Sequence, residues 1–192
     1  MASPASSPFV APERVGFIGL GNMGAPMARR LLGAGYKLVL SDALPATVDK
    51  LVAEAPSASE RSAGPEALAK ACRVIITMLP DGKVVREVLL GANGLARHLG
   101  AGSVVIDMSS SSPVGTRELS ADLAKLGIPL VDAPVSGGVK KAIDGSLAIM
   151  VGGEAPVVER CRPVLEPMGK VFTTGGAGTG HAMKSMNNFL SA

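Results

Sequence analysis

The chain has 192 residues, enough for one large domain or for one domain with part of another. Hydrophobic residues make up 47% and aromatic residues only 3%, so the core must be built from aliphatic side chains and Met. The net charge of +3 is spread along the chain without a basic stripe, which argues against a nucleic-acid partner. No apolar stretch approaches the ~18 residues that a membrane span needs, so no membrane association is expected.

The first segment, residues 1–13, is rich in Ala, Ser and Pro, and we interpret it as a disordered leader. It has neither the basic start nor the apolar centre of a signal peptide, which favours a cytoplasmic protein. Cys72 and Cys161 form no C-x-x-C pair and are expected to be buried free thiols. His98 and His181 lie in no metal-ligand pattern, so no metal site is predicted; each is expected to be a surface or local hydrogen-bonding residue.

A glycine motif follows the first predicted strand, within the segment RVGFIGLGNMGAPMA at residues 14–28. In G-x-G-x-x-G, Gly19 permits a tight turn, Gly21 lets a pyrophosphate approach the backbone, and Gly24 lets the next helix lie close to the strand. The start of that helix offers N–H groups and a positive dipole end to the anion. An ordinary glycine turn is the alternative, because the chain has 24 glycines. The predicted cofactor contacts here are Gly19, Leu20, Gly21, Asn22, Met23 and Gly24.

A helix over 23–32 and a second strand over 36–42 continue this unit. Asp42 lies 18 residues beyond Gly24, about where a dinucleotide-binding unit places the carboxylate that accepts hydrogen bonds from the ribose hydroxyls. Its charge would repel a 2′-phosphate, so the sequence favours NAD over NADP as the cofactor. The alternative is a helix N-cap or turn aspartate, since a helix over 46–55 follows.

Short β-like runs alternate with helical segments along the rest of the chain. Strands are predicted over 74–78, 103–108, 128–132, 147–151 and 170–174, and helices over 65–71, 83–90, 113–126 and 155–165. Strands that are apolar on both faces and separated by helices predict an α/β fold with a Rossmann-type, doubly wound, mostly parallel sheet. We place this domain at residues 14–176 and the start of a further helix at 177–192. Ligands of such sheets bind at the carboxyl ends of the strands.

Two of these strand ends carry candidate cofactor contacts. Met78, Leu79 and Pro80 form an apolar bend that could pack against the cofactor, although a simple proline turn explains them equally well. Ser110 belongs to a run of serines before Pro113, where a hydroxyl either caps the next helix or faces the cleft.

A third strand end carries a candidate anion site. Ser136, Gly137 and Gly138 combine a hydroxyl with two flexible backbone N–H groups, a natural cradle for a carboxylate. A plain β-turn is the competing interpretation.

The last segment contains the catalytic candidate. In GTGHAMKSMNN, residues 178–188, a helix would place Gly180, Lys184 and Asn188 on one face. Gly180 would leave room on that face, Lys184 would offer a mobile proton donor, and Asn188 would offer a fixed amide. A lysine partly removed from water beside a cofactor has a lowered pKa and can exchange protons. A solvated surface lysine is the alternative.

Taken together, these segments resemble the β-hydroxyacid dehydrogenases related to 6-phosphogluconate dehydrogenase, and most closely the 3-hydroxyisobutyrate dehydrogenases. The matching pieces occur in order as GFIGLGNMGAPMA, ITMLP, VIDMSS, DAPVSGG, GSLAIMVGG and GTGHAMKSMNN. The resemblance implies an NAD-dependent oxidoreductase that interconverts a small 3-hydroxy acid and its semialdehyde. It makes Lys184 the general acid/base and Asn188 a substrate partner. It also implies that Ser136, Gly137 and Gly138 hold the substrate carboxylate and that Leu79, Pro80 and Ser110 line the cofactor site.

The sequence departs from the family pattern in three respects. Ser110 stands where the family usually has Thr, and Arg30 stands where it often has Asn or His. The all-helical C-terminal domain of the family, through which a homo-oligomer would form, has no counterpart in this sequence. Tartronate semialdehyde reductase and a threonate-type dehydrogenase are alternative activities. A non-catalytic nucleotide-binding fragment is the alternative from a different class.

Overall fold

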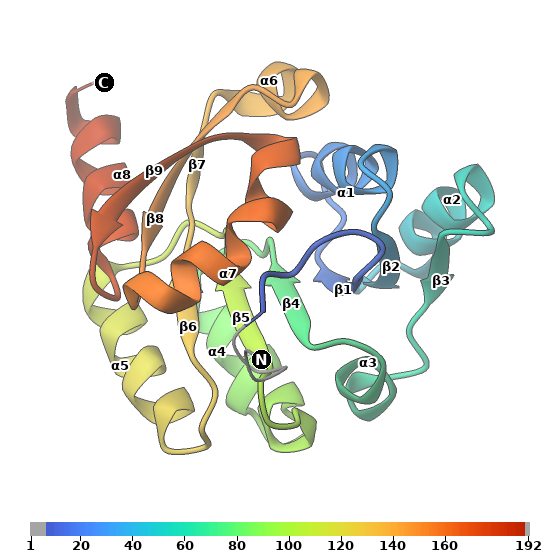
Figure 1. Cartoon of the computed structure of the whole chain (residues 1–192), viewed down its shortest axis with the longest axis horizontal. Coiled ribbons are helices and arrows are strands. Elements are labelled where there is room, and N and C mark those ends of the chain that lie inside the picture. The colour runs from blue at the N-terminus through green and yellow to red at the C-terminus, as the bar shows by residue number, and fades with distance from the viewer. Residues whose placement is uncertain (1–6, 191–192) are drawn as a thin grey trace.

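The computed structural model describes residues 7–190, which fold around one nine-stranded sheet (Figure 1). The strand order is β3-β2-β1-β4-β5-β6-β8-β7, with β9 beside β8. The strands are β1 (Arg14–Ile18), β2 (Lys37–Ser41), β3 (Ser59–Arg61), β4 (Val74–Thr77), β5 (Val104–Asp107), β6 (Leu130–Asp132), β7 (Val135–Ser136), β8 (Leu147–Gly152) and β9 (Gly169–Gly175). The helices are α1 (Gly24–Gly33), α2 (Pro45–Glu54), α3 (Pro65–Ala71), α4 (Gly82–Leu90), α5 (Pro113–Ala124), α6 (Gly138–Asp144), α7 (Ala155–Leu165) and α8 (Thr179–Leu190), with short 3-10 turns η1 (Leu95–His98) and η2 (Glu166–Met168).

The sheet is parallel from β3 through β2, β1, β4 and β5 to β6. Beyond β6 it changes direction, because β8 runs antiparallel to both β6 and β7, while β9 is parallel to β8. The predicted Rossmann-type, doubly wound and mostly parallel fold is therefore confirmed. The carboxyl ends of β1, β2, β4, β5 and β6 meet along one edge, where such sheets bind ligands.

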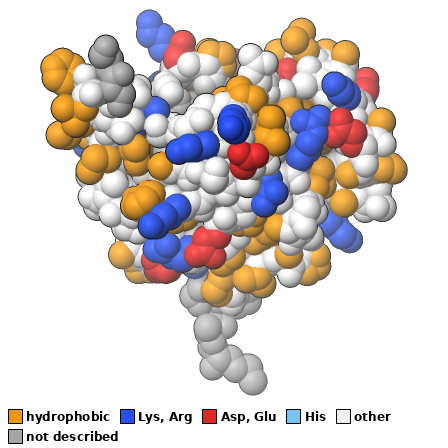
Figure 2. Space-filling model, turned by 90° about the horizontal axis from the view of Figure 1, so that it is seen from above, with side chains coloured by type: hydrophobic (Ala, Val, Ile, Leu, Met, Phe, Trp, Pro, Cys, Tyr) orange, Lys and Arg blue, Asp and Glu red, His pale blue; other side chains and the backbone are white. Residues whose placement is uncertain are grey.

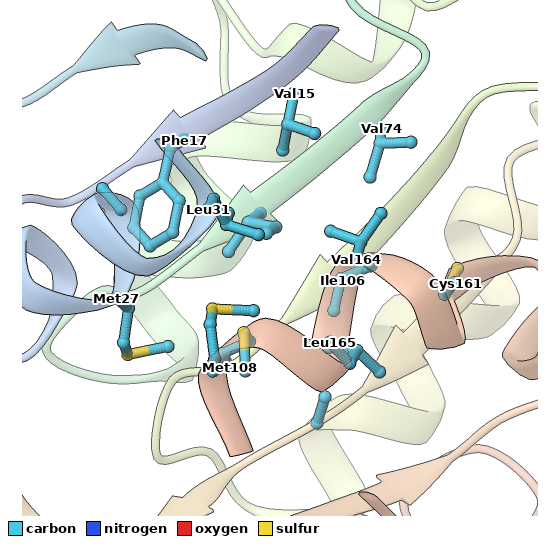
Figure 3. Packing of buried hydrophobic residues seen from close by; sticks show 14 of the residues in the cluster. Val15, Phe17, Met27, Leu31, Val74, Ile106, Met108, Cys161, Val164 and Leu165 are labelled. Carbon is cyan, nitrogen blue, oxygen red and sulfur yellow. The ribbon is translucent and has the colours of Figure 1, made fainter. Parts of the chain in front are cut away.

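Alternate residues of each strand belong to two hydrophobic cores, one on each face of the sheet. In β1, Val15 and Phe17 pack with α1 and α7, whereas Ile18 packs with α3, α4 and α5. Figure 3 shows side chains of α1 and α7, among them Leu31 and Val164, lying over β1, β4 and β5. Helices thus cover both faces, as continuous apolar strands require.

The predicted elements lie close to the observed ones. The helices over 65–71 and 155–165 match α3 and α7 at both ends. The sequence prediction missed β3, whose three polar residues have no apolar pattern and are strand only because their backbone pairs with β2. It also missed β7 and α6, because the paired glycines before α6 suggest a turn.

The segment before β1 is packed against the domain and corrects part of the predicted leader. Phe9 is 1% exposed, and its N–H donates to the carbonyl of Arg160 at 3.0 Å. Its own carbonyl accepts a hydrogen bond from the Tyr36 hydroxyl at 3.1 Å. The ring lies beneath the guanidinium groups of Arg73 and Arg160. An aromatic side chain in a Pro-rich segment thus orders residues 7–13, while residues 1–6 lie outside the described part.

Cys72 and Cys161 are free and buried, as predicted. Burial raises the pKa of each thiol to about 12.

Among the residues that the structure describes, no group of three His, Cys, Asp or Glu side chains could hold a metal ion. Within residues 7–190 no helix is long and apolar enough to cross a membrane. On the face in Figure 2, Lys and Arg side chains are spread among acidic and hydrophobic ones.

Candidate functional site

The glycine motif forms a turn that is closed on the protein side and open on the other. Gly19 has a φ of +96°, and a Cβ there would collide with the Met78 carbonyl oxygen. A Cβ on Gly24 would collide with the Gly19 carbonyl oxygen, so α1 lies directly on the turn. A Cβ on Gly21 would meet nothing within 4 Å. Gly21, which we predicted to lie against the pyrophosphate, therefore borders open space.

Asp42 is held rigidly at the end of β2 by backbone hydrogen bonds. Its Oδ2 accepts from the Leu20 N–H at 2.6 Å, and its Oδ1 accepts from the Leu44 N–H at 2.8 Å. The N-cap residue of α2 is Leu44, so a helix N-cap at Asp42 is wrong, whereas the alternative of a turn aspartate is confirmed by the bond from the Leu44 N–H two residues on. Each carboxylate oxygen can accept a further hydrogen bond, which leaves Asp42 able to bind ribose hydroxyls.

A cavity of about 840 Å³ lies at the carboxyl ends of β1, β2 and β4. The predicted cofactor residues that line it are Gly19, Gly21, Asn22, Met23, Gly24, Asp42, Met78, Leu79 and Pro80. Residues that were not predicted complete its wall, among them Ser41, Ser62, Gly64, Val84, Val88 and Asn93. A helix start, an open glycine and a fixed carboxylate around one cavity of this size fit a dinucleotide. The apolar wall would hold the uncharged parts of that ligand.

Two predicted cofactor residues lie elsewhere. Leu20 is 1% exposed and contributes its backbone N–H to Asp42 rather than a side chain to the cavity. Ser110 lines a separate cavity of about 450 Å³, between α4 and α5. The hydroxyl that shapes the turn after β4 belongs to buried Ser109, whose Oγ accepts from the Leu79 N–H at 2.9 Å. Within a run of serines, the sequence gives no signal for which one turns inward.

The predicted carboxylate cradle lies at the opposite part of the same sheet edge. Ser136 ends β7, and Gly137 and Gly138 follow with φ of +132° and +69°, conformations that favour glycine. Both glycines are exposed. The Asn187 Nδ2 of α8 donates to the Ser136 Oγ at 3.3 Å, so the last helix lies beside the cradle.

Lys184 is half-buried on α8, and its partial burial lowers the pKa of its amine. It precedes Asn187 by one helical turn and so projects from the same side of α8 as the bond to Ser136. Gly180, one turn earlier, is buried, and a Cβ there would meet the Asp132 carbonyl oxygen at 2.8 Å. The expected open space at Gly180 is therefore wrong, because the backbone of β6 and β8 fills it, and the missing side chain instead lets α8 lie against these strands. Asn188 is exposed; the amide that contacts the cradle is that of Asn187.

Two buried aspartates that sequence reasoning did not select lie beside the first turn of α8, and one of them, Asp132, holds it directly. Asp132, at the end of β6, accepts from the Gly178 N–H at 2.7 Å and from the His181 N–H at 2.9 Å. Asp107, at the end of β5, accepts from the Thr77 hydroxyl and the Ser109 N–H, each at 3.0 Å. These partners are far apart along the chain, which is why no local pattern indicated them.

His181 is 1% exposed and lies between the two carboxylates, which corrects the surface alternative and confirms the hydrogen-bonding one. Its Nε2 is 3.0 Å from the Ser109 carbonyl oxygen, and its Nδ1 is 2.9 Å from the Thr116 Oγ1. The carboxylate oxygens of Asp132 and Asp107 lie 3.5 and 3.9 Å from the ring nitrogens. The ring therefore joins α8 to α5 and to the ends of β5 and β6.

Comparison with known proteins agrees with this geometry. The sequence profile of the NAD binding domain of 6-phosphogluconate dehydrogenase matches residues 14–176. The chain belongs to that family. The predicted resemblance is thereby confirmed, and the matched residues are those that we assigned to the Rossmann domain.

The named relatives of the chain include dehydrogenases and reductases. It is 41% identical to the NAD-dependent L-serine dehydrogenase of Pseudomonas aeruginosa over 94% of this chain and 60% of that protein. The structure of a 3-hydroxyisobutyrate dehydrogenase of Mycobacterium tuberculosis with L-serine is 43% identical, with a TM-score of 0.84 over 93% of this chain and 60% of that one. A 30% identical structure, Psf3 in complex with NADP+ and 2-OPP, has a TM-score of 0.86 over 92% and 62% of the two chains. The chain thus spans about 60% of the length of the relatives it matches.

Proposed function

We propose that this protein is an NAD-dependent oxidoreductase that interconverts a small 3-hydroxy acid and its semialdehyde. The observation that carries the proposal is the placement of two sites along one sheet edge. The cavity at β1, β2 and β4 suits a dinucleotide, and the cradle suits a carboxylate and lies beside α8, the helix that carries Lys184. The relatives named as L-serine and 3-hydroxyisobutyrate dehydrogenases support the reaction class.

In this proposal, Gly21 and the start of α1 bind the cofactor diphosphate, and Asp42 binds the adenosine ribose. Asp42 favours NAD, since its charge repels a 2′-phosphate, and the Leu20 and Leu44 N–H groups hold it in place. When bound, NAD supplies the hydride acceptor for the oxidation.

The substrate half of the proposal assigns one task to each predicted residue. Ser136 and the N–H groups of Gly137 and Gly138 bind the carboxylate. Lys184 takes the proton of the hydroxyl during oxidation and returns it during reduction, and its lowered pKa suits that exchange. Asn188 orients the substrate from the next turn of α8.

The decisive test is Lys184→Ala. We expect turnover to fall by about 10²- to 10⁴-fold, the usual contribution of a positioned proton-transfer group, while NAD affinity stays within about twofold. NADH formation followed by absorbance gives turnover, and calorimetry gives affinity. Lys70→Ala, an exposed lysine on α3, is the matched control and should change neither. Equal turnover in the Lys184 variant would remove its catalytic role.

Because the chain spans about 60% of its relatives' length, a second candidate is a nucleotide-binding unit without turnover. The same two assays separate the candidates, since NAD binding without NADH formation supports the second. Where turnover is found, parallel rates with 3-hydroxyisobutyrate, L-serine, tartronate semialdehyde and threonate identify the substrate. A cytoplasmic location and a homo-oligomeric assembly remain predictions.

A further inference from the structure

We propose that His181 is a positioning residue, which holds the first turn of α8 against the ends of β5 and β6 and thereby fixes the place of Lys184. The inference rests on the proposed function, in which Lys184 exchanges the substrate proton.

Apolar side chains hold little of α8 in place; its fixed contacts are polar bonds and the close approach of Gly180 to the sheet. Gly180 and His181 are the buried residues of this 12-residue helix. Its large apolar side chains point outward, since Met183 is 45%, Met186 61% and Phe189 84% exposed. Figure 2 shows hydrophobic side chains gathered at the edge of the molecule where α8 lies. Apolar packing against the described domain therefore contributes little to the position of the helix, and polar contacts must set it.

His181 makes three polar contacts, one through its backbone and two through its ring. Its N–H donates to Asp132 on β6 at 2.9 Å. The ring joins Ser109 after β5 and Thr116 on α5, at 3.0 and 2.9 Å. The two ring partners belong to different elements, so the ring cannot move toward one without losing the other, while the contact to Asp132 is made by the backbone. Buried polar groups that lose a partner are costly, which makes this arrangement strongly preferred.

The hydrogen-bond roles are also constrained. A carbonyl oxygen only accepts, so the Nε2 of His181 must carry a hydrogen and donate it to Ser109. Nδ1 lies 2.9 Å from the Thr116 Oγ1, and the hydroxyl also reaches the Ser112 carbonyl oxygen at 3.0 Å, so both acceptors compete for its one hydrogen. The side-chain amide of Gln places N–H donors near the position of Nε2, so it can keep the contact to Ser109, whereas Ala keeps neither ring contact.

The helix links the ring to the amine. Lys184 follows His181 by three residues, so the two side chains are neighbours on the helix surface. The Ser185 hydroxyl donates to the His181 carbonyl at 2.9 Å, which closes the intervening turn. A rotation or lift of the first turn would therefore carry Lys184 with it, away from the environment that lowers its pKa.

The test uses two readouts, one of which does not need turnover. Lysines are labelled by reductive methylation with ¹³C, and the Lys184 resonance is identified by its absence in Lys184→Arg. In the unsubstituted protein it should titrate at lower pH than the resonances of exposed lysines. In His181→Ala we expect that titration to move up toward the exposed lysines, and in His181→Gln to stay near the original value.

The second readout is kinetic and measures kcat and KM separately. His181→Ala should lower kcat by about 10- to 100-fold, since a displacement near 1 Å can cost about 10²-fold, with KM for NAD within about twofold. Leu123→Ala, a fully buried truncation on α5 away from the ring, is the control for lost stability and should leave the Lys184 titration unchanged. If His181→Ala does not fold, Thr116→Val removes one ring partner at constant size and should move the titration in the same direction.

The outcomes separate the two proposals. An unchanged Lys184 titration in folded His181→Ala and Thr116→Val would overturn the positioning role, as would a His181→Gln variant that behaves like Ala. A titration that moves while turnover does not supports the positioning role and removes the catalytic role of Lys184.

Discussion

The two halves of the functional edge are built in opposite ways. At the ends of β1, β2 and β4, glycines, one carboxylate and an apolar wall surround an open cavity. At the ends of β5 and β6, two buried aspartates and a histidine close the space and fix a helix. A binding surface for a ligand must stay open, whereas an amine that is to act on the ligand, as we propose for Lys184, must stay still.

The largest expected effect on stability concerns the closed half. Asp132→Ala removes the acceptor for the Gly178 and His181 N–H groups, both of which stay buried. We expect a loss of about 3–5 kcal/mol in the free energy of unfolding, measured by denaturant titration. Asp144→Ala, on exposed α6, is the control and should cost at most about 0.5 kcal/mol. Equal effects of the two substitutions would mean that the closed half has no special rigidity.

In the open half, two glycines should respond differently. Gly19→Ala forces a side chain into a φ of +96° and against the Met78 carbonyl, for a loss of about 2–3 kcal/mol of stability. Gly21→Ala meets nothing within 4 Å and should keep stability within about 0.5 kcal/mol. It should still weaken NAD binding by at least about tenfold, because the new methyl group occupies the diphosphate's place. Gly33→Ala, at the exposed end of α1, should change neither quantity. A Gly21 variant with unchanged affinity would contradict the assigned cofactor site.

Asp42→Ala tests the open half through its effect on the choice between NAD and NADP. Loss of hydrogen bonds to a charged acceptor should lower NAD affinity by about 10- to 100-fold. Loss of the negative charge should raise the ratio of NADP to NAD affinity. Calorimetric titration with both cofactors measures that ratio, which a general loss of stability would leave unchanged. An unaltered ratio would show that Asp42 lies away from the ribose.

The smallest effect is expected at a surface ion pair beside the open half. Arg29 of α1 donates two hydrogen bonds to Glu54 of α2, and the hydrogen bond lowers the pKa of the Glu54 carboxyl. This contribution is present above the ordinary glutamate pKa and is lost as the pH falls through the lowered value. Both side chains are well exposed, so Glu54→Gln should cost at most about 1 kcal/mol at neutral pH and nothing in acid. A pH series of unfolding curves measures this cost. A larger cost would mean that this surface ion pair contributes as much to the free energy of unfolding as the buried aspartates.

The open half could be predicted from the sequence because its signals are local. The three glycines lie within six residues, and Asp42 follows at a fixed spacing set by one strand and one helix. The apolar runs likewise gave the strands and helices nearly at their observed ends. Where the pattern was missing, as in β3 with its polar residues, the strand was missed as well.

The closed half could not be predicted, because its contacts join residues that are distant in the sequence. His181 meets Ser109 and Thr116, which lie 72 and 65 residues before it. In the sequence, a buried histidine cannot be told from a surface histidine, because only the fold brings its partners together. The same reason applies to Ser109, which the sequence does not distinguish from Ser110.

The packing of Phe9 has a consequence for synthesis on the ribosome. β1, which follows it, lies near the middle of the sheet, and the carbonyl that receives the Phe9 N–H belongs to Arg160 on α7. Tyr36 and Arg73 follow early, but the emerging polypeptide must hold Phe9 without its contacts to Arg160 until more than 150 further residues have left the exit tunnel. Phe9→Ser would remove this exposed ring from the nascent chain. In the folded domain the same substitution would leave a cavity beside the guanidinium groups of Arg73 and Arg160.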